Sequence, residues 1–132
     1  RQLRKSEGYR ETPYLDSVGK LTVGIGRNID EVPFSEDEIN LMFINDVEKA
    51  ESMASLYPSF DYLSQPRKAV LIRMTFQLGM RGTLKFKRMH AALAVKDYEG
   101  VADEMLDSKW ASQTPHRARR MAEQMRSGIW VY

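Results

Sequence analysis

The sequence predicts an α+β fold that is mostly helical, with a small β-hairpin lobe and a larger helical lobe. Three observations support this prediction. Residues 14–25 combine turn formers and glycines with an alternation of apolar and small or polar residues, which is typical of a hairpin. Ser35-Glu36-Asp37-Glu38 then forms a capping box, which marks the start of a helix. Beyond it, apolar residues recur at helical spacing.

The chain length fits a single domain. The chain has 132 residues, of which 42% are hydrophobic, and a domain of this size buries roughly two-thirds of the surface of its unfolded chain. We therefore expect one domain over residues 1–132, in which residues 8–34 form the small hairpin lobe and residues 60–132 the helical lobe. A crevice between two lobes is the usual place for a ligand.

In the first half of the chain, a short helix over residues 3–7 is expected to end at Gly8, which can take the left-handed conformation after a helix. The hairpin at residues 14–25 is the only β segment that the pattern predicts. The helix opened by the capping box is expected to lay one apolar stripe on a core and to end at Tyr57-Pro58. The stripe consists of Ile39, Met42, Phe43, Val47, Ala50 and Ala54.

The second half of the chain is expected to be helical throughout. Ser64 and Pro66 open a helix that is apolar in nearly every direction, which predicts a buried central helix. Shorter helices are expected near residues 84–95 and 98–106. Thr114 and Pro115 then supply a cap and a first-turn proline for a basic helix that runs to about Met125.

Composition and motifs exclude several kinds of site. The chain has no cysteine, so it has neither a disulfide nor a zinc–thiolate centre. His90 and His116 fall on different expected helices, without a second histidine or patterned carboxylates nearby, so we expect no metal and no cofactor. The Gly-x-Ser-x-Gly elbow of serine hydrolases is absent, and Gly24-Ile25-Gly26 lacks the third glycine of a dinucleotide loop.

Membrane insertion and nucleic-acid binding are not expected either. No apolar run approaches the ~20 residues of a membrane span, and no signal peptide is visible, although an upstream export or anchor segment is left open. The formal net charge of +2 is mildly basic. The basic helix carries Arg117, Arg119 and Arg120, but a basic helix face without interleaved aromatic residues is usually solvated surface.

Carboxylates remain as candidate catalytic groups. Most of the 18 acidic residues must be solvated surface, but Glu7 and Asp16 stand out by their location. Glu7 lies at a helix end directly before Gly8, and Asp16 lies where the hairpin begins. If the loop between them brings them together, two carboxyl groups lie on opposite walls of a cleft, which is the arrangement that glycoside hydrolysis needs.

Three separated segments resemble the phage-type (T-even type) lysozymes, which form glycoside hydrolase family twenty-four. The resemblance is strongest near the N-terminus and covers nearly the whole chain in one order, which also implies a lysozyme-like two-lobed domain. The segments are Leu3-Arg4-Lys5-Ser6-Glu7-Gly8-Tyr9 with Tyr14-Leu15-Asp16 and Leu21-Thr22-Val23-Gly24-Ile25-Gly26, then Phe76-Gln77-Leu78-Gly79, and finally Trp110-Ala111-Ser112-Gln113-Thr114-Pro115-His116-Arg117-Ala118-Arg119-Arg120.

The resemblance implies three catalytic residues. Glu7 matches the general acid that protonates the glycosidic oxygen, and Asp16 matches the carboxylate that positions or deprotonates the attacking water. Thr22 matches the residue whose hydroxyl, as donor and acceptor, helps to hold that water. The family is of the inverting type, which implies carboxyl groups about 6.5–9.5 Å apart with a water between them.

The resemblance also implies five substrate-binding residues: Phe76, Gln77, Gln113, Thr114 and Arg117. Two of them have alternative structural roles, because Phe76 also fits core packing and Thr114 also fits a helix cap. Arg117 matches an arginine beside the catalytic glutamate. A nearby cation lowers a carboxyl pKa, whereas a general acid at neutral pH needs a raised pKa. Burial, bound substrate or a purely orienting role of the arginine would resolve this conflict.

The chain departs from many relatives at two places. Arg27 follows Gly26 where many relatives have a histidine, so a buried contact between histidine and carboxylate is not expected. The segment between the hairpin and the capping box, residues 27–34, is short, so we expect a smaller minor lobe than in the T-even enzyme. Neither departure touches the three candidate catalytic residues.

The implied function is that of an endolysin, an antimicrobial peptidoglycan hydrolase that cleaves the β-1,4 bond between N-acetylmuramic acid and N-acetylglucosamine and causes cytolysis of bacteria. Two alternatives stay open: a catalytically silent peptidoglycan-binding module, and a lytic transglycosylase of the same fold. The expected partners are the glycan strands of peptidoglycan, and the expected state is a monomer. By analogy with phage endolysins, we expect the host cytoplasm as its location before release to the periplasm and cell wall.

Overall fold

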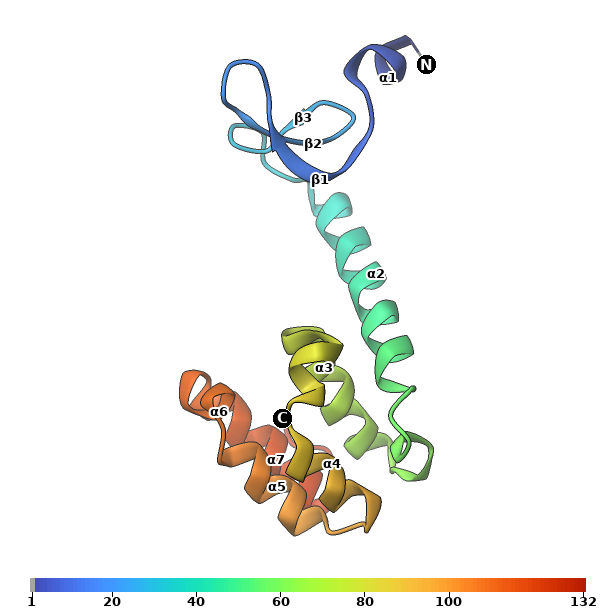
Figure 1. Ribbon diagram of the computed structural model, residues 1–132, viewed down its shortest axis with the longest axis vertical. Coiled ribbons are helices and arrows are strands. Elements are labelled where there is room, and N and C mark those ends of the chain that lie inside the picture. The colour runs from blue at the N-terminus through green and yellow to red at the C-terminus, as the bar shows by residue number, and fades with distance from the viewer. Residues whose placement is uncertain (1) are drawn as a thin grey trace. The chain divides into compact units, whose positions relative to one another are not determined.

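The computed structural model describes residues 2–132, and within the first helix the side chains of Arg4, Ser6 and Glu7 lie outside the described part. The chain divides into two compact units, Arg1–Phe43 and Ile44–Tyr132. Figure 1 shows a small sheet in the first unit and a group of helices in the second. The mostly helical α+β fold is therefore confirmed. The predicted lobes fall within these units, and their union into one domain stays a prediction.

The first unit contains a short helix and a three-stranded antiparallel sheet in the order β1-β2-β3. The helix ends where predicted, because Gly8 has the left-handed φ of +80°. The prediction of a lone hairpin is wrong, since a third strand follows the turn at Ile25-Gly26; its two residues are too few to show an alternating pattern. The elements are α1 (Gln2–Glu7), β1 (Arg10–Leu15), β2 (Leu21–Gly24) and β3 (Arg27–Asn28).

The predicted capping box opens helix α2 (Glu36–Ala54). The Ser35 N–H donates to Glu38 Oε1 at 2.8 Å, and the Glu38 N–H donates to Ser35 Oγ at 3.1 Å. Arg27 also binds the Glu38 carboxylate with two nitrogens, at 2.6 and 3.1 Å. Glu38 thus closes the helix end and connects it to β3, and Arg27 has a carboxylate partner where many relatives have a histidine.

The apolar stripe of α2 is buried only at its C-terminal end, where Ala50 and Ala54 lie in the core. The prediction that the whole stripe packs on a core is wrong for Ile39, Met42 and Phe43, which are 52%, 43% and 57% exposed. The reason is that the hydrophobic core is assembled from residues 54–125 of the second unit, so only the last turns of α2 contribute to it.

The second unit is a group of helices that pack against one another, with α7 in contact with α3, α5 and α6. The predicted helices are present. The short helix α6 is not among the predictions, because five residues are too few to show a periodic pattern. None of the described helices is long and apolar enough to cross a membrane. The elements are η1 (Phe60–Tyr62), α3 (Gln65–Leu84), α4 (Lys87–Ala94), α5 (Tyr98–Leu106), α6 (Lys109–Gln113) and α7 (Pro115–Ser127).

Helix α7 shows how the core forms. Its fully buried residues recur at three- and four-residue spacing, while its arginines between them are exposed. Each buried methionine contributes about 1.5–3 kcal/mol through removal of its side chain from water. The buried residues of α7 in the core are Ala118, Met121, Ala122 and Met125; members from other elements include Val70, Leu71, Met74, Met89, Leu93, Val101 and Met105.

Helix α3 is not uniformly buried, although its sequence is apolar in nearly every direction. Val70, Leu71 and Met74 are fully buried, but Phe76 is 45% exposed. The helix is kinked at Gly79, whose φ of +72° and ψ of 168° are not helical. The Thr83 hydroxyl donates to the Gly79 carbonyl at 2.9 Å, which satisfies a backbone group at the kink.

Candidate active site

Asp16 lies at the turn of the β1–β2 hairpin, immediately after β1. Its Oδ1 accepts hydrogen bonds from the backbone N–H groups of Val18 at 2.9 Å and Lys20 at 2.8 Å. Such bonds fix the backbone of a turn, so Asp16 has a structural role beside the predicted catalytic one. Both bonds use the same oxygen. Among the described residues no hydrogen bond reaches Oδ2, which leaves this oxygen for a water or a ligand.

Thr22 lies in the middle strand β2, where it pairs with Tyr14 of β1 and Asn28 of β3. Thr22 is only 3% exposed, and its hydroxyl donates to the Lys20 carbonyl at 3.0 Å. The same carbonyl accepts the backbone N–H of Asp16 at 2.9 Å. One carbonyl therefore joins two of the predicted catalytic residues at one end of the hairpin.

Glu7 is the last residue of α1, and the chain enters β1 soon after it, at Arg10. The Glu7 side chain lies outside the described residues, so its surroundings are not defined. The opposed arrangement of the Glu7 and Asp16 carboxyl groups therefore stays a prediction. The structure thus brings Asp16 and Thr22 together, whereas for Glu7 it gives only the position of the backbone.

In the second unit, Trp110 binds one predicted substrate-binding residue and shares a cavity with another. The indole N–H of Trp110 donates to Oε1 of Gln77 at 3.0 Å, which joins α6 to α3. Gln113 follows on α6 and lines the same cavity as Trp110. The sequence-based set lacks Trp110 itself. The sequence feature that could have identified Trp110 is its indole N–H, because this group needs a hydrogen-bond partner when the ring is buried. Trp110 is 4% exposed.

The prediction that the Thr114 side chain caps α7 is wrong. Thr114 does occupy the N-cap position, but its side chain makes no capping hydrogen bond. Its hydroxyl donates backward to the Trp110 carbonyl at 3.0 Å. Thr114 also follows α6, whose last carbonyl groups have no partner within the helix. The Thr114 hydroxyl donates to one of these carbonyl groups instead of capping α7. A substrate-binding role of Thr114 stays a prediction.

Phe76 lies apart from Gln113. It is 45% exposed, so core packing does not explain this residue. It lines a cavity of about 300 Å³ together with Asp46 and Lys49 of α2 and Gly79 of α3. Gln113 lines a different cavity. The second unit therefore does not place the five predicted substrate-binding residues around one hollow.

Arg117 is exposed in the first turn of α7. Its charge and that of Arg120 lower the pKa of Arg73 on α3, in addition to the larger effect of burial on Arg73. The Arg73 guanidinium group is therefore close enough to those of Arg117 and Arg120 to be repelled by them. The contact between Arg117 and Glu7 that the resemblance implies stays a prediction, because the Glu7 side chain lies outside the described residues.

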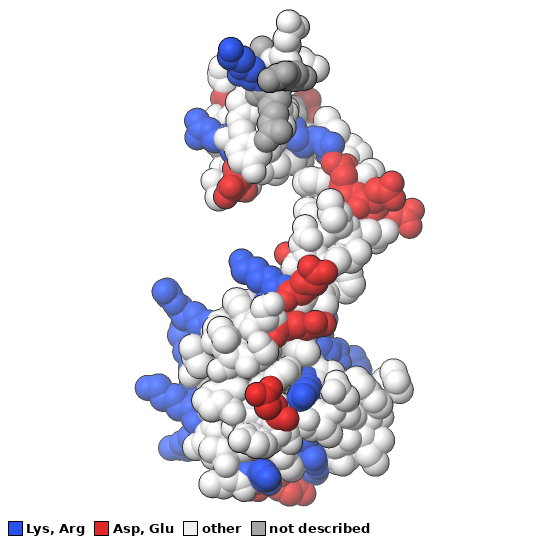
Figure 2. Space-filling model, turned by 90° about the vertical axis from the view of Figure 1, so that its right-hand side faces the viewer, with Lys and Arg blue, Asp and Glu red and all other residues white. Residues whose placement is uncertain are grey.

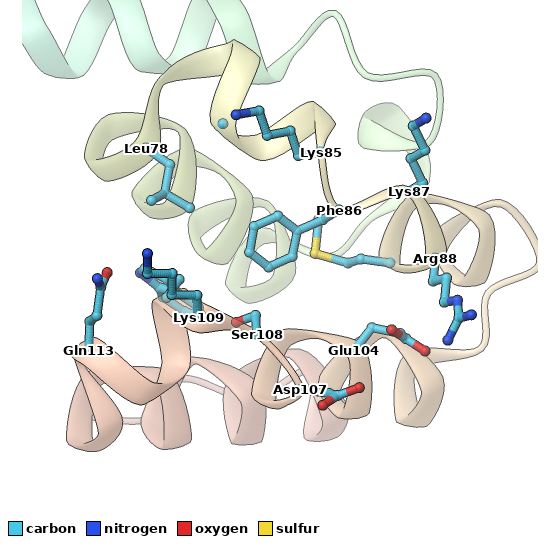
Figure 3. A pocket seen from close by; sticks show the side chains of 13 residues that line it. Leu78, Lys85, Phe86, Lys87, Arg88, Glu104, Asp107, Ser108, Lys109 and Gln113 are labelled. Carbon is cyan, nitrogen blue, oxygen red and sulfur yellow. The ribbon is translucent and has the colours of Figure 1, made fainter.

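The larger cavity, of about 610 Å³, lies where the end of α3 and α4 face α5 and α6 (Figure 3). Phe86, Met89 and Trp110 give it apolar walls. Figure 3 shows Lys85 and Lys109 on opposite walls. The size of this hollow lies in the range of ligand pockets, and its lining also includes several charged side chains. Of the predicted substrate-binding residues, Gln113 lines it.

Among the described residues, no group of three or more histidine, cysteine or acidic side chains could hold a metal ion. His90 has a structural explanation. Its Nε2 lies 3.2 Å from the Thr83 carbonyl oxygen, and its ring centroid lies 4.9 Å from that of Tyr57. Burial lowers the pKa of His90, while the hydrogen bond with Thr83 raises it.

Comparisons with known proteins identify the family of this chain. A family model described as phage lysozyme matches residues 4–124. A "Probable T4-type lysozyme 2" and a "Probable T4-type lysozyme 1" of Dictyostelium discoideum are each 26% identical to the chain, over 96% of it and 92% of their own length. The "Pre-baseplate central spike protein Gp5" of Enterobacteria phage T4 is 27% identical over 90% of this chain, which corresponds to 26% of that protein. This chain belongs to the phage lysozyme family, whose function at the family level is peptidoglycan hydrolysis by a glycoside hydrolase.

Proposed function

We propose that this chain is a muramidase that cleaves the β-1,4 bond between N-acetylmuramic acid and N-acetylglucosamine in peptidoglycan, with inversion at the anomeric carbon. The observation that supports this proposal most directly is the joining of Asp16 and Thr22 through the Lys20 carbonyl. A carboxylate and a hydroxyl held on one rigid hairpin end can fix a single water between them. A transglycosylase, which uses no attacking water, has no need for this pair.

In the proposed reaction, Glu7 gives its proton to the glycosidic oxygen as the bond between that oxygen and the anomeric carbon breaks. Water attacks the anomeric carbon from the opposite face and gives a proton to Oδ2 of Asp16. The Thr22 hydroxyl hydrogen is already donated to the Lys20 carbonyl, so Thr22 accepts a hydrogen bond from the water instead of donating one. Proton exchange with solvent then restores both carboxyl groups.

The remaining predicted residues complete this proposal. Phe76, Gln77, Gln113 and Thr114 bind the sugar rings, and Arg117 orients Glu7. The partner is the glycan strand of peptidoglycan, and the enzyme acts as a monomer without a cofactor. In the setting that the family suggests, the chain is an endolysin that remains in the host cytoplasm until it is released to the cell wall and causes lysis.

Product analysis tests the reaction. We expect purified chain to release new reducing ends from peptidoglycan in the α configuration, as seen by nuclear magnetic resonance within the first turnovers. Glu7→Gln should abolish this release, since an amide cannot donate the proton, while the melting temperature stays close to that of the parent. Products with an anhydro ring would instead identify a transglycosylase, and absence of any release would identify a binding module.

A matched pair of substitutions tests the role of Asp16. Asp16→Asn keeps an amide oxygen that can accept the Val18 and Lys20 N–H groups, so we expect the hairpin to stay folded while hydrolysis falls by roughly a hundredfold or more. Asp30→Asn is the control, because Asp30 also accepts a backbone N–H in this unit, that of Leu21. Equal losses in the two variants would show that hydrolysis depends on hairpin structure and not on the Asp16 carboxylate.

A further inference from the structure

Helices α3 and α7 run antiparallel, because the start of α3 lies against the end of α7, while Gln77 near the end of α3 is joined through Trp110 to Thr114, directly before α7. Arg67 of α3 donates to the carbonyl oxygens of Met125 at 2.6 Å and Arg126 at 2.9 Å, and Gln124 of α7 donates to the Pro66 carbonyl at 2.7 Å. These bonds fix the register between the two helices. A side chain further along α3 therefore lies level with one nearer the start of α7.

This register brings three arginines close together. Arg73 lies about 9 Å along α3 from Arg67, at a rise of 1.5 Å per residue, and the same distance back along α7 leads to Arg120. Arg117 is one turn earlier on α7, and residues three apart on a helix are neighbours. We call Arg73, Arg117 and Arg120 the arginine cluster. All three residues are exposed. Partial burial lowers the pKa of Arg73 most, and the charges of Arg117 and Arg120 lower it further, as expected for neighbouring guanidinium groups.

Within the described part of the chain, the arginine cluster has no acidic partner; the Glu7 side chain, which Arg117 is proposed to orient, lies outside that part. Among the described residues, no carboxylate lies within ion-pair distance of its three guanidinium groups. Arg126 on the same helix differs, because it is paired with Glu99, Asp103 and Glu123. Figure 2 shows that Lys and Arg side chains follow one edge of the second unit without acidic side chains between them.

The cluster adjoins the predicted substrate-binding residues. Gln77 lies one turn after Arg73 on α3, and Thr114 directly precedes the first turn of α7, which carries Arg117. Trp110 ties these two segments together through Gln77. The positive charge therefore lies at the border of the surface that is proposed to hold the glycan strand.

We propose that the arginine cluster binds the free carboxylate groups of the peptides attached to the glycan strands, so that the enzyme prefers strands whose peptides carry negative charge. The planar guanidinium group binds a carboxylate through two parallel hydrogen bonds, and several guanidinium groups can share one ligand. This inference rests on the proposed function, because it takes peptidoglycan as the substrate. It adds a specificity-determining site to which Arg73 and Arg120 belong.

Binding of two matched fragments tests the inference. The probes are a disaccharide that carries a peptide with free carboxylates and the same molecule with those carboxylates amidated, titrated calorimetrically at low salt. We expect the parent to bind the free acid roughly tenfold more tightly, which corresponds to about 1.4 kcal/mol. Arg73→Gln and Arg120→Gln should remove this preference, and Arg73→Lys should keep part of it. Arg119→Gln is the control, since Arg119 contacts His116 and lies outside the cluster.

Three results would overturn the inference: equal affinity of the parent for both fragments, an unchanged preference in Arg73→Gln and Arg120→Gln, or an equal loss in Arg119→Gln. The cluster variants are expected to fold, because each removes repulsion between like charges; melting temperatures verify this. Hydrolysis of fully amidated peptidoglycan by the parent separates the two proposals. If the parent cleaves this substrate as fast as peptidoglycan with free carboxylates, only the arginine site is refuted, whereas failure to cleave either substrate would refute the proposed function.

Discussion

At the scale of single residues, Thr22 combines a buried position with a hydroxyl that has two proposed tasks. The hydroxyl hydrogen holds the Lys20 carbonyl at 3.0 Å, and the hydroxyl oxygen is proposed to hold the attacking water. Because Thr22 is 3% exposed, its methyl group also contributes to packing. The methyl group therefore contributes to stability alone, whereas the hydroxyl contributes both to stability and to the proposed activity, and two substitutions distinguish these contributions.

Thr22→Val keeps the shape and removes the hydroxyl, so we expect hydrolysis to fall roughly a hundredfold and stability to fall by about 0.5–1.5 kcal/mol with the lost hydrogen bond. Thr22→Ser keeps the hydroxyl and removes the methyl group, so we expect activity within a few-fold of the parent and a loss of about 1 kcal/mol. Urea unfolding and turbidity assays on cell walls measure both. Parental activity in Thr22→Val would contradict the role in water positioning.

At the scale of elements, the capping box of α2 carries an electrostatic contribution that responds to acid. The hydrogen bond from Arg27, with that from the Ser35 N–H, lowers the pKa of Glu38 to about 2. The charged form of Glu38 is thus favoured in the folded chain over the unfolded chain, where a glutamate titrates near pH ~4.3. Its contribution to stability is complete above that pH and is lost as the pH falls toward about 2.

We therefore expect Glu38→Gln to be less stable than the parent at neutral pH and to lose less stability between about pH 4 and about pH 2. The amide oxygen can still accept the Ser35 N–H, so the difference reports mainly on the ion pair with Arg27. Free energies of unfolding in urea across this pH range measure it. Glu36→Gln, in the same helical turn, is the control; a parallel pH dependence in parent and Glu38→Gln would rule out the assigned linkage.

At the scale of the whole molecule, the apolar core is unevenly distributed. Thr22 is the only buried residue among the described residues 2–43, whereas the core cluster lies wholly within residues 54–125. Regions with few buried apolar contacts open at lower free energy than regions that form the core. The sheet and the helical unit should therefore differ in their local stability.

Native-state hydrogen exchange measures this difference. We expect backbone amides of β2 and β3 to exchange faster than those of α3, α5 and α7, whose buried residues include Leu71, Val101 and Met121. The slowest amides of the helical unit should exchange only on global unfolding. Equal protection in the sheet and in the core helices would show that the chain unfolds as one cooperative unit.

The sequence predicted the features that depend on near neighbours in the chain. The reciprocal bonds of Ser35 and Glu38 join residues three apart, and Gly8 ends α1 because glycine tolerates its φ of +80°. The family resemblance named Asp16 and Thr22, and the structure adds the Lys20 carbonyl that joins them. The opposed position of Glu7 stays a prediction.

Other features were decided only by the tertiary structure, because their partners lie far apart in the chain. The indole N–H of Trp110, for example, donates to Gln77, which lies 33 residues earlier in the chain, and no local pattern indicates this bond. The same limit applies to the arginine cluster, since spacing places Arg117 and Arg120 on one helix but does not reveal that Arg73 lies level with them. A periodic pattern indicates which face of a helix is apolar. It does not indicate which other element packs against that face or which charged residues that element carries, because both depend on the packing of the whole chain.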